Sequence, residues 1–289
     1  MKRVLVAGAS GALGSCVVKE LRARGAWVRA ITRSKERARH IVADEVVIGD
    51  ALRPDSLPAP VRDIDVVFSC LGQTVSPDFS IRRPGYLKVD LPANFNLLTA
   101  ARTGGVSRFV YVSVLNAARF PGVAYLAAHA QVSALIKESR IDYGIVEPTG
   151  FFSQLGSLLD LARAGRAMLF GAGETRSNPI AEADLAEVCA DLVDGVGSMV
   201  VQTGGPDILT RRQMYEEAFA ALNQPPNIRR LPLQSLGALR WLTGWHAPRI
   251  SELLHFVELL SQHDFVAPIR GRRRLREHFA ALAQGGVGC

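Results

Sequence analysis

Short apolar segments alternate with amphipathic helical segments through the first two-thirds of this 289-residue chain. The apolar segments are rich in valine and isoleucine on both faces, as strands are when helices cover both sides of a sheet. Such alternation predicts parallel strands joined by crossover helices, which is a doubly wound α/β sheet. The predicted strands include RVLVAG, WVRAITR, EVVIGD, DVVFSCLG, RFVYVSV and DYGIVEP, and the predicted helices include SCVVKELRARG, FNLLTAARTGG and AHAQVSALIKES.

The pattern changes after the sixth predicted strand. A helix and a glycine-broken segment come next, followed by another helix and a short apolar run, MVVQTGG, that could add a strand. The remainder is mostly helical and interrupted by prolines. We therefore expect a main domain over residues 1–150, with residues 176–204 returning to it, and a small, mostly helical cap lobe made of residues 151–175 and 205–289.

Three glycines at the first strand-to-helix turn are the strongest functional signal. Gly8, Gly11 and Gly14 are spaced G-x-x-G-x-x-G, directly after a strand and around the start of a helix. Such a turn lets the backbone approach a pyrophosphate, which the positive N-terminus of the helix attracts. The alternative is that the glycines serve only a tight turn. The residues expected to hold a dinucleotide here are Gly8, Ser10, Gly11, Ala12, Leu13 and Gly14.

Basic residues follow the second predicted strand. A site that prefers NAD would carry an acidic side chain there for the adenosine ribose, whereas this chain reads ITRSK at residues 31–35. The planar guanidinium of Arg33 suits a ribose phosphate, and Ser34 or Lys35 could assist. The pattern therefore favours NADP(H) over NAD(H), with a solvated basic loop as the alternative.

Further contacts are expected where other strands end, because ligands of such sheets bind beyond the carboxyl ends of the parallel strands. Asp50 is placed to meet the adenine, although a turn or helix-capping role is an equal alternative. Phe151 and Phe152 are equally compatible with the core. The expected cofactor contacts are Asp50, Ala51, Leu71, Gly72, Pro148, Thr149 and Phe151, and the expected substrate contacts are Gln73, Thr74, Phe152 and Asn178.

Several longer stretches carry a family signal: GASGALG, the arginine at residue 33, AARTGGVSRFVYVSV, SALIKESRIDYGIVEPTGFF, NPIAEADLAE and APIRGRRRLREHF. In these stretches the chain resembles the short-chain dehydrogenase/reductase superfamily, in particular its atypical branch of NmrA-like and divinyl-reductase-like NAD(P)H-binding proteins. Since the resemblance covers most of the chain, it implies a Rossmann fold.

The resemblance also implies catalytic positions. In that superfamily a serine after the fifth strand orients a carbonyl, and a Tyr-x-x-x-Lys pair supplies a proton donor and an ammonium that lowers its pKa. The matching residues are Ser113, Tyr125 and His129, so histidine replaces lysine. Ser113 and His129 would also contact the cofactor. A neutral histidine lowers a tyrosine pKa less than an ammonium does, so proton relay by His129 and a mere lining role for the pair both stay open.

Composition narrows the remaining choices. The net charge of +7 fits an anionic cofactor without any further motif. The arginines at residues 270–276 are expected at a solvated helix start rather than in a nucleic-acid patch, because no aromatic platform accompanies them. The four cysteines have spacings that suit neither zinc nor a small disulfide framework, and no metal is expected. We expect no membrane span and no export signal, hence a cytoplasmic location.

Three functions compete. The leading one is an NADPH-dependent reductase of an apolar or aromatic small molecule, and the second is a non-catalytic regulator or assembly protein that binds NADP(H) alone. A sugar-nucleotide epimerase or dehydratase ranks last, since it normally needs an intact tyrosine and lysine pair. We expect a monomer or homodimer that binds no nucleic acid. Trp241 and Trp245 are expected to be buried against the main domain, with a lid or a membrane contact as alternatives.

Overall fold

Seven parallel strands form the main sheet of the computed structural model, within the residues that it describes, 1–75 and 84–286. The strand order is β3-β2-β1-β4-β5-β6-β9. The chain therefore switches direction across the sheet between β1 and β4, the place where doubly wound sheets bind ligands. The strands are β1 (Arg3–Ala7), β2 (Trp27–Thr32), β3 (Glu45–Ile48), β4 (Val66–Ser69), β5 (Arg108–Val112), β6 (Asp142–Pro148) and β9 (Met199–Thr203).

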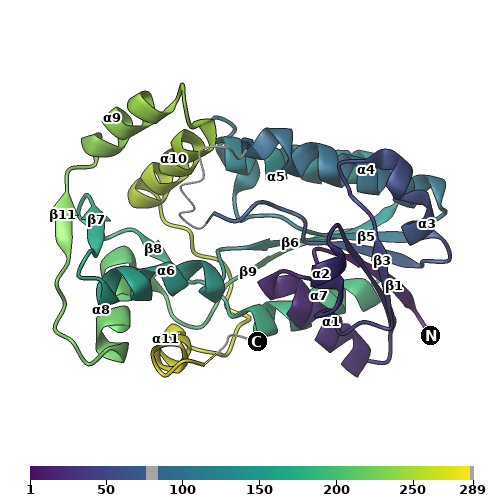
Figure 1. Cartoon of the computed structure of the whole chain (residues 1–289), viewed down its shortest axis with the longest axis horizontal. Helices are drawn as coiled ribbons and strands as arrows, with labels where there is room; N and C mark the ends of the chain where they lie inside the picture. Colours follow the sequence, from purple (N-terminus) through teal and green to yellow (C-terminus); the bar gives the residue numbers. More distant parts are fainter. Residues whose placement is uncertain (76–83, 287–289) are drawn as a thin grey trace.

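Helices cover both faces of this sheet (Figure 1). Val4 and Val6 of β1 pack in one core with α1 and α7, whereas Leu5 packs in the opposite core with α4 and α5. This two-sided burial confirms the predicted doubly wound fold. The covering elements are α1 (Ala12–Ala23), α2 (Lys35–Ala38), η1 (Pro54–Ser56), α3 (Pro58–Val61), η2 (Tyr86–Lys88), α4 (Asp90–Thr103), η3 (Ala117–Arg119), α5 (Ala124–Glu138) and α7 (Glu182–Asp194).

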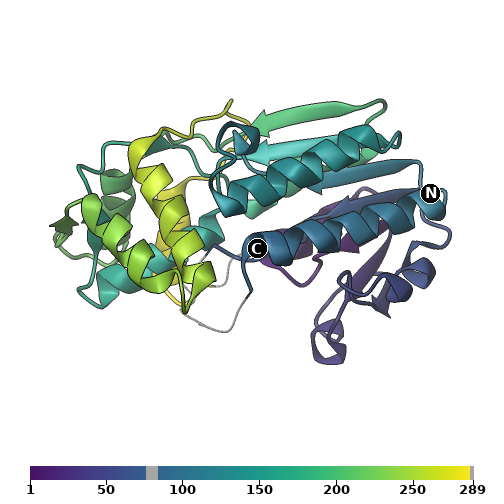
Figure 2. The ribbon, with the colours of Figure 1, turned by 90° about the horizontal axis from the view of Figure 1, so that it is seen from above.

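A second group of elements lies beyond the carboxyl ends of the strands (Figures 1 and 2). Phe152, Phe219 and Phe279 build its apolar core, while Phe256 of α10 packs on Tyr125 of α5. β7 pairs with β11, and β8 pairs with β10. The elements are α6 (Phe152–Arg163), β7 (Met168–Phe170), β8 (Arg176–Ser177), β10 (Leu209–Thr210), α8 (Arg211–Ala221), β11 (Arg229–Leu231), α9 (Gln234–Thr243), α10 (Pro248–Gln262) and α11 (Leu275–Ala283).

Two details of the sequence interpretation are settled by this arrangement. The run MVVQTGG does add a strand, β9, which pairs in parallel with β6. The expected burial of Trp241 and Trp245 is wrong, because their side chains are 77% and 90% exposed. The helix buries Leu236 instead, on the face that meets α10. The boundaries between the main domain and the cap lobe stay a prediction.

The arginines of residues 270–276 lie around the start of α11, as expected. Four of them form ion pairs within the chain: Arg272 with Glu187, Arg273 with Asp184, Arg274 with Asp207 and Arg276 with Glu217. These bonds tie the C-terminal segment to α7 and α8. Among the described residues, no helix is long and apolar enough to cross a bilayer, and no cluster of three or more His, Cys, Asp or Glu side chains could hold a metal ion.

Candidate cofactor and active site

The turn between β1 and α1 has room only for glycine at positions 8 and 14. Gly8 adopts a positive φ of 95°, and a Cβ there would meet the carbonyl oxygen of Cys70 at 2.9 Å. A Cβ on Gly14 would overlap the Gly8 carbonyl group. The Gly11 amide donates to that carbonyl oxygen at 2.9 Å and closes the turn. The glycines therefore let β1, α1 and the end of β4 approach more closely than side chains allow.

The N-terminus of α1 carries bare amides. Gly11 is the N-cap, forms no side-chain cap hydrogen bond, and no acidic residue stands in the first turn. Ser10, Gly11 and Ala12 are exposed, whereas Leu13 and Gly14 are buried. Unsatisfied amides and the helix dipole together attract a phosphate. The chain thus offers an anion cradle where the sequence predicts a pyrophosphate.

Arg33 stands beside this cradle at the end of β2. It is exposed, and it lies two residues beyond Ile31, whose partner in β1 is Ala7. No ion pair occupies its guanidinium within the described part of the chain. Ser34, by contrast, accepts the Arg37 amide at 3.2 Å and caps α2. Arg33 is therefore free to meet an anion, whereas the Ser34 hydroxyl already has a structural role.

The end of β3 shows the turn role that was left open for Asp50. Its Oδ1 accepts the Leu52 amide at 3.0 Å, and its own amide donates to Ser56 Oγ at 2.9 Å. The carbonyl oxygen of Ala51 accepts the Asn96 amide at 2.9 Å. Contact of Asp50 and Ala51 with adenine stays a prediction.

A buried carboxyl group that the sequence interpretation missed lies at the end of β4. Asp90 begins α4, is 1% exposed, and accepts the Gln73 amide at 3.0 Å through Oδ1. Its Oδ2 is buried without a hydrogen bond from any described residue, and a Cβ on Gly72 would stand 3.8 Å from that atom. Burial raises the pKa of Asp90 to about 7. A carboxyl that can hold or release a proton near neutrality therefore stands beside the predicted contacts Leu71 and Gly72.

Hydrogen bonds connect residue 73 to the segment before η2 and residue 74 to the cap helix α10. The Gln73 side chain donates to the carbonyl oxygens of Pro84 and Gly85 at 3.1 and 3.2 Å. The Thr74 carbonyl oxygen accepts from Arg249, which is 2% exposed. These bonds hold the loop after β4 in place. Substrate contact by Gln73 and Thr74 stays a prediction.

Tyr125 and His129 lie one turn apart on α5, and both side chains are buried. Their rings meet edge to face with centroids 4.8 Å apart. The Tyr111 hydroxyl lies 2.7 Å from His129 Nδ1. Burial lowers the pKa of His129 to about 4 and raises the pKa of Tyr125 well above its usual range. His129 is therefore neutral near pH 7 and supplies no positive charge to Tyr125.

Ser113 follows β5 and is 2% exposed. Its Oγ accepts a hydrogen bond from Ser133 Oγ at 3.1 Å, and its amide donates to the Val146 carbonyl oxygen at 2.8 Å. The hydroxyl hydrogen of Ser113 remains available as a donor in this arrangement. The catalytic roles of Ser113, Tyr125 and His129 stay predictions.

The segment after β6 is held by a hydrogen bond to the backbone of Asn178. Thr149 Oγ1 donates to the Asn178 carbonyl oxygen at 2.6 Å. The Asn178 side chain is 0% exposed, donates to the carbonyl oxygens of Gly205 and Ala267, and accepts the Ala267 amide at 3.0 Å. Phe152 is 2% exposed in the lobe core. These contacts favour structural roles for Asn178 and Phe152. Cofactor contact by Pro148, Thr149 and Phe151 stays a prediction.

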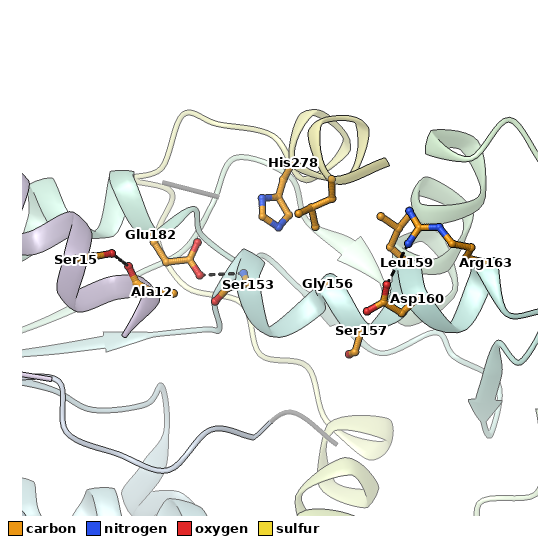
Figure 3. A pocket seen from close by; sticks show the side chains of 11 residues that line it. Ala12, Ser15, Ser153, Gly156, Ser157, Leu159, Asp160, Arg163, Glu182 and His278 are labelled. Atoms are coloured by element: carbon orange, nitrogen blue, oxygen red, sulfur yellow. Dashed lines mark hydrogen bonds and ion pairs between the residues drawn. The ribbon is translucent and has the colours of Figure 1, made fainter. Parts of the chain in front are cut away.

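A cavity of about 530 Å³ adjoins the start of α1 (Figure 3). Figure 3 shows Ala12 and Ser15 at one end and the Asp160–Arg163 ion pair at the other. Glu182 accepts the Ser153 amide at 2.9 Å and lies near His278, whose pKa burial lowers. The cavity is lined by Ala12, Ser15, Ser153, Gly156, Ser157, Leu159, Asp160, Arg163, Glu182, His278 and Leu282. Space for a small molecule therefore continues from the anion cradle towards α6 and α11.

The comparisons with known proteins agree with this geometry. Residues 8–195 match the NAD(P)H-binding family, and the chain belongs to that family. The divinyl chlorophyllide a 8-vinyl-reductase of Cucumis sativus is 33% identical over 258 residues, which are 80% of this chain and 59% of that protein. The photosystem II assembly factor Ycf39 of Guillardia theta is 26% identical over 265 residues, which are 89% of this chain and 83% of that protein.

Solved structures share the fold. The triphenylmethane reductase of Citrobacter, complexed with NADP(H), superposes with a TM-score of 0.75 at 17% identity, over 97% of this chain and 99% of that chain. Together with the family match, this shared fold confirms the predicted resemblance to NAD(P)H-binding proteins of Rossmann type. The chain spans only 59% of the length of the cucumber reductase that it matches.

Proposed function

We propose that this protein binds NADP(H) at the β1–α1 turn and acts as an NADPH-dependent oxidoreductase on an apolar or aromatic small molecule. The observation that carries the proposal is the bare N-terminus of α1, lined by Gly8 and Gly14. The guanidinium of Arg33, which has no ion pair with a described residue, follows the neighbouring strand β2. Amides suit the pyrophosphate and the guanidinium suits a ribose phosphate. The proposal of an NADPH-dependent reductase is also supported by the similarity to a divinyl chlorophyllide reductase and to a triphenylmethane reductase.

Different groups of the proposed site have different roles in binding and proton transfer. When bound, NADPH supplies the hydride. The turn amides hold the pyrophosphate, and residues 148–151 stand beside the nicotinamide end. Tyr125 keeps its proton at neutral pH because burial raises its pKa, so its hydroxyl can donate a hydrogen bond to a substrate oxygen. Asp90, with a pKa of about 7, is a second proton source beside the loop that follows β4.

The test combines cofactor binding with turnover. NADPH and NADH are titrated by fluorescence, and quinones, enones and aldehydes are then screened for loss of NADPH absorbance at saturating cofactor. We expect turnover with at least one class, and a fall of roughly 100-fold or more in Tyr125→Phe. Tyr143→Phe, at a half-buried tyrosine near the start of β6, serves as the matched control. Tight NADPH binding with no oxidation anywhere in the panel would remove the reductase proposal for those substrate classes.

A non-catalytic regulator or assembly protein is the second candidate. The observation that favours it is the neutral, buried His129 at the place of the expected lysine. Ycf39, a photosystem II assembly factor by name, is among the relatives. This candidate predicts NADPH-dependent protection of the lobe from hydrogen exchange, without oxidation of the cofactor. A sugar-nucleotide epimerase or dehydratase remains the third candidate, because histidine stands where the tyrosine and lysine pair would have its lysine.

Location and assembly also belong to the proposal. The cytoplasmic location expected from the sequence stays a prediction, since the cucumber relative is a chloroplast protein. The expected monomer or homodimer is equally open to measurement by sedimentation.

A further inference from the structure

The outer face of α9 is an apolar stripe. Ala238, Trp241, Leu242 and Trp245 recur at i, i+3, i+4 and i+7, the spacing of one helix face, with Trp245 just past the end of the helix. Trp241 is 77% exposed, Leu242 61% and Trp245 90%. Figures 1 and 2 show α9 at the outer edge of the lobe. We call these four residues the α9 stripe.

The inner face of the same helix is firmly anchored. Leu236 is fully buried, and Arg240 pairs with Glu258 of α10 at 2.5 Å. Ser251 of α10 donates to the Arg240 carbonyl oxygen at 3.2 Å. Because α10 in turn packs on α5, the α9 stripe is held on a supported helix and points away from the lobe. The stripe is therefore left uncovered by the described residues.

The charge around the stripe indicates what that partner is. Residues 218–251 contain no Asp or Glu but four arginines. Arg229 and Arg230 lie on β11, which leads directly into α9, and both are exposed. They form no ion pair with described residues, whereas the arginines around α11 are paired. An apolar stripe with tryptophans and neighbouring unpaired arginines matches the interface of a bilayer that carries anionic headgroups.

We propose that the α9 stripe docks on an anionic lipid bilayer. Trp241, Leu242 and Trp245 would enter the headgroup boundary, and Arg229 and Arg230 would contact the headgroups. Exposed tryptophan suits this depth because its ring is apolar while its N–H stays hydrogen-bonded. A helix of ten residues is too short to span a bilayer, so α9 lies in the plane of the interface. This inference does not depend on the proposed reductase activity.

The test uses the full chain and vesicles of phosphatidylcholine, with or without phosphatidylglycerol. We expect co-sedimentation with the anionic vesicles only, weakened by salt, together with a blue shift of tryptophan emission and quenching by brominated lipid. The chain has three tryptophans, and only Trp27 lies outside the α9 stripe, so these signals report on the stripe. Trp241→Ser/Trp245→Ser should weaken binding on the order of tenfold or more. Val196→Ser, at an 87% exposed valine before β9, is the matched control and should leave it unchanged.

Other outcomes would overturn the docking proposal. Equal binding to neutral vesicles would remove the role of the arginines, which Arg229→Ser/Arg230→Ser tests separately. Binding that survives the double tryptophan substitution would remove the role of the stripe. A dimer in the absence of lipid that the same substitution dissociates would show that a second copy covers α9. NADPH binding, which the substitutions should not alter, verifies that each variant is folded.

Discussion

The hydroxyl of Tyr111 lies 2.7 Å from Nδ1 of His129, and both side chains are buried between β5 and α5. This contact directs Nδ1 of the imidazole towards Tyr111. An uncharged ring, held by a tyrosine, cannot attract the phenolate form of Tyr125 as an ammonium would. The candidate site therefore combines an anion cradle with a neutral histidine at the position where the family resemblance implies a lysine.

The first prediction concerns the charge of His129. Because burial lowers its pKa to about 4, its imidazole signals in NMR should stay constant between about pH 5.5 and pH 8. Since the unfolded chain binds the proton more readily, His129 should lower the free energy of unfolding as pH falls from 6.5 towards 4. Titration of His129 near pH 6.5 would contradict the neutral pair.

The second prediction concerns Asp90. Its pKa is raised from 3.8 to about 7, so the folded state binds this proton more tightly than the unfolded chain. Its stabilising contribution is therefore complete below pH 3.8 and is lost as pH rises through about 7. Asp90→Asn cannot titrate, and its stability relative to wild type should rise by roughly 1–3 kcal/mol between about pH 5 and pH 8 in urea unfolding.

The third prediction separates two glycines of the turn. Gly14→Ala places a methyl group against the Gly8 carbonyl and should cost roughly 1–3 kcal/mol of stability along with NADPH binding. Gly11→Ala meets the same oxygen at 3.3 Å and should fold with much less loss. Thermal unfolding with and without NADPH measures both effects. Equal Tm values for the two variants would show that the close approach at Gly14 is not needed.

The fourth prediction concerns the buried side-chain hydrogen bonds of Asn178. Asn178→Ala removes three buried hydrogen bonds to the backbone of Gly205 and Ala267, leaving those groups unsatisfied. We expect a loss of about 3 kcal/mol or more in the free energy of unfolding. Asn96→Ala, which removes one half-buried bond to Ala51, should cost about 1 kcal/mol. If Asn178→Ala instead left stability intact and weakened only substrate turnover, the substrate role predicted from the sequence would be favoured.

Local patterns were enough to predict the sheet and the glycine turn. The GASGALG turn and the strand runs around it depend on neighbouring residues, so the sequence shows them directly. Asp90 gave no such signal, because an acidic residue at the start of a helix is ordinary, and its burial depends on α10 and the loop after β4. The exposure of Trp241 was missed for a related reason. An apolar helix face predicts burial, but only the packing of Leu236 on α10 decides which face is covered.

Cofactor choice is the central claim, and Arg33 gives the most direct measurement of it. Dissociation constants for NADPH and NADH are determined by fluorescence titration for wild type, Arg33→Ala and Arg62→Ala, the last at an exposed arginine between α3 and β4, near the amino ends of the strands. Wild type should prefer NADPH, and Arg33→Ala should weaken NADPH by roughly 1–3 kcal/mol while sparing NADH. Arg62→Ala should match wild type. Equal loss of both cofactors in Arg33→Ala, or a wild-type preference for NADH, would contradict the assignment of Arg33 to the ribose phosphate.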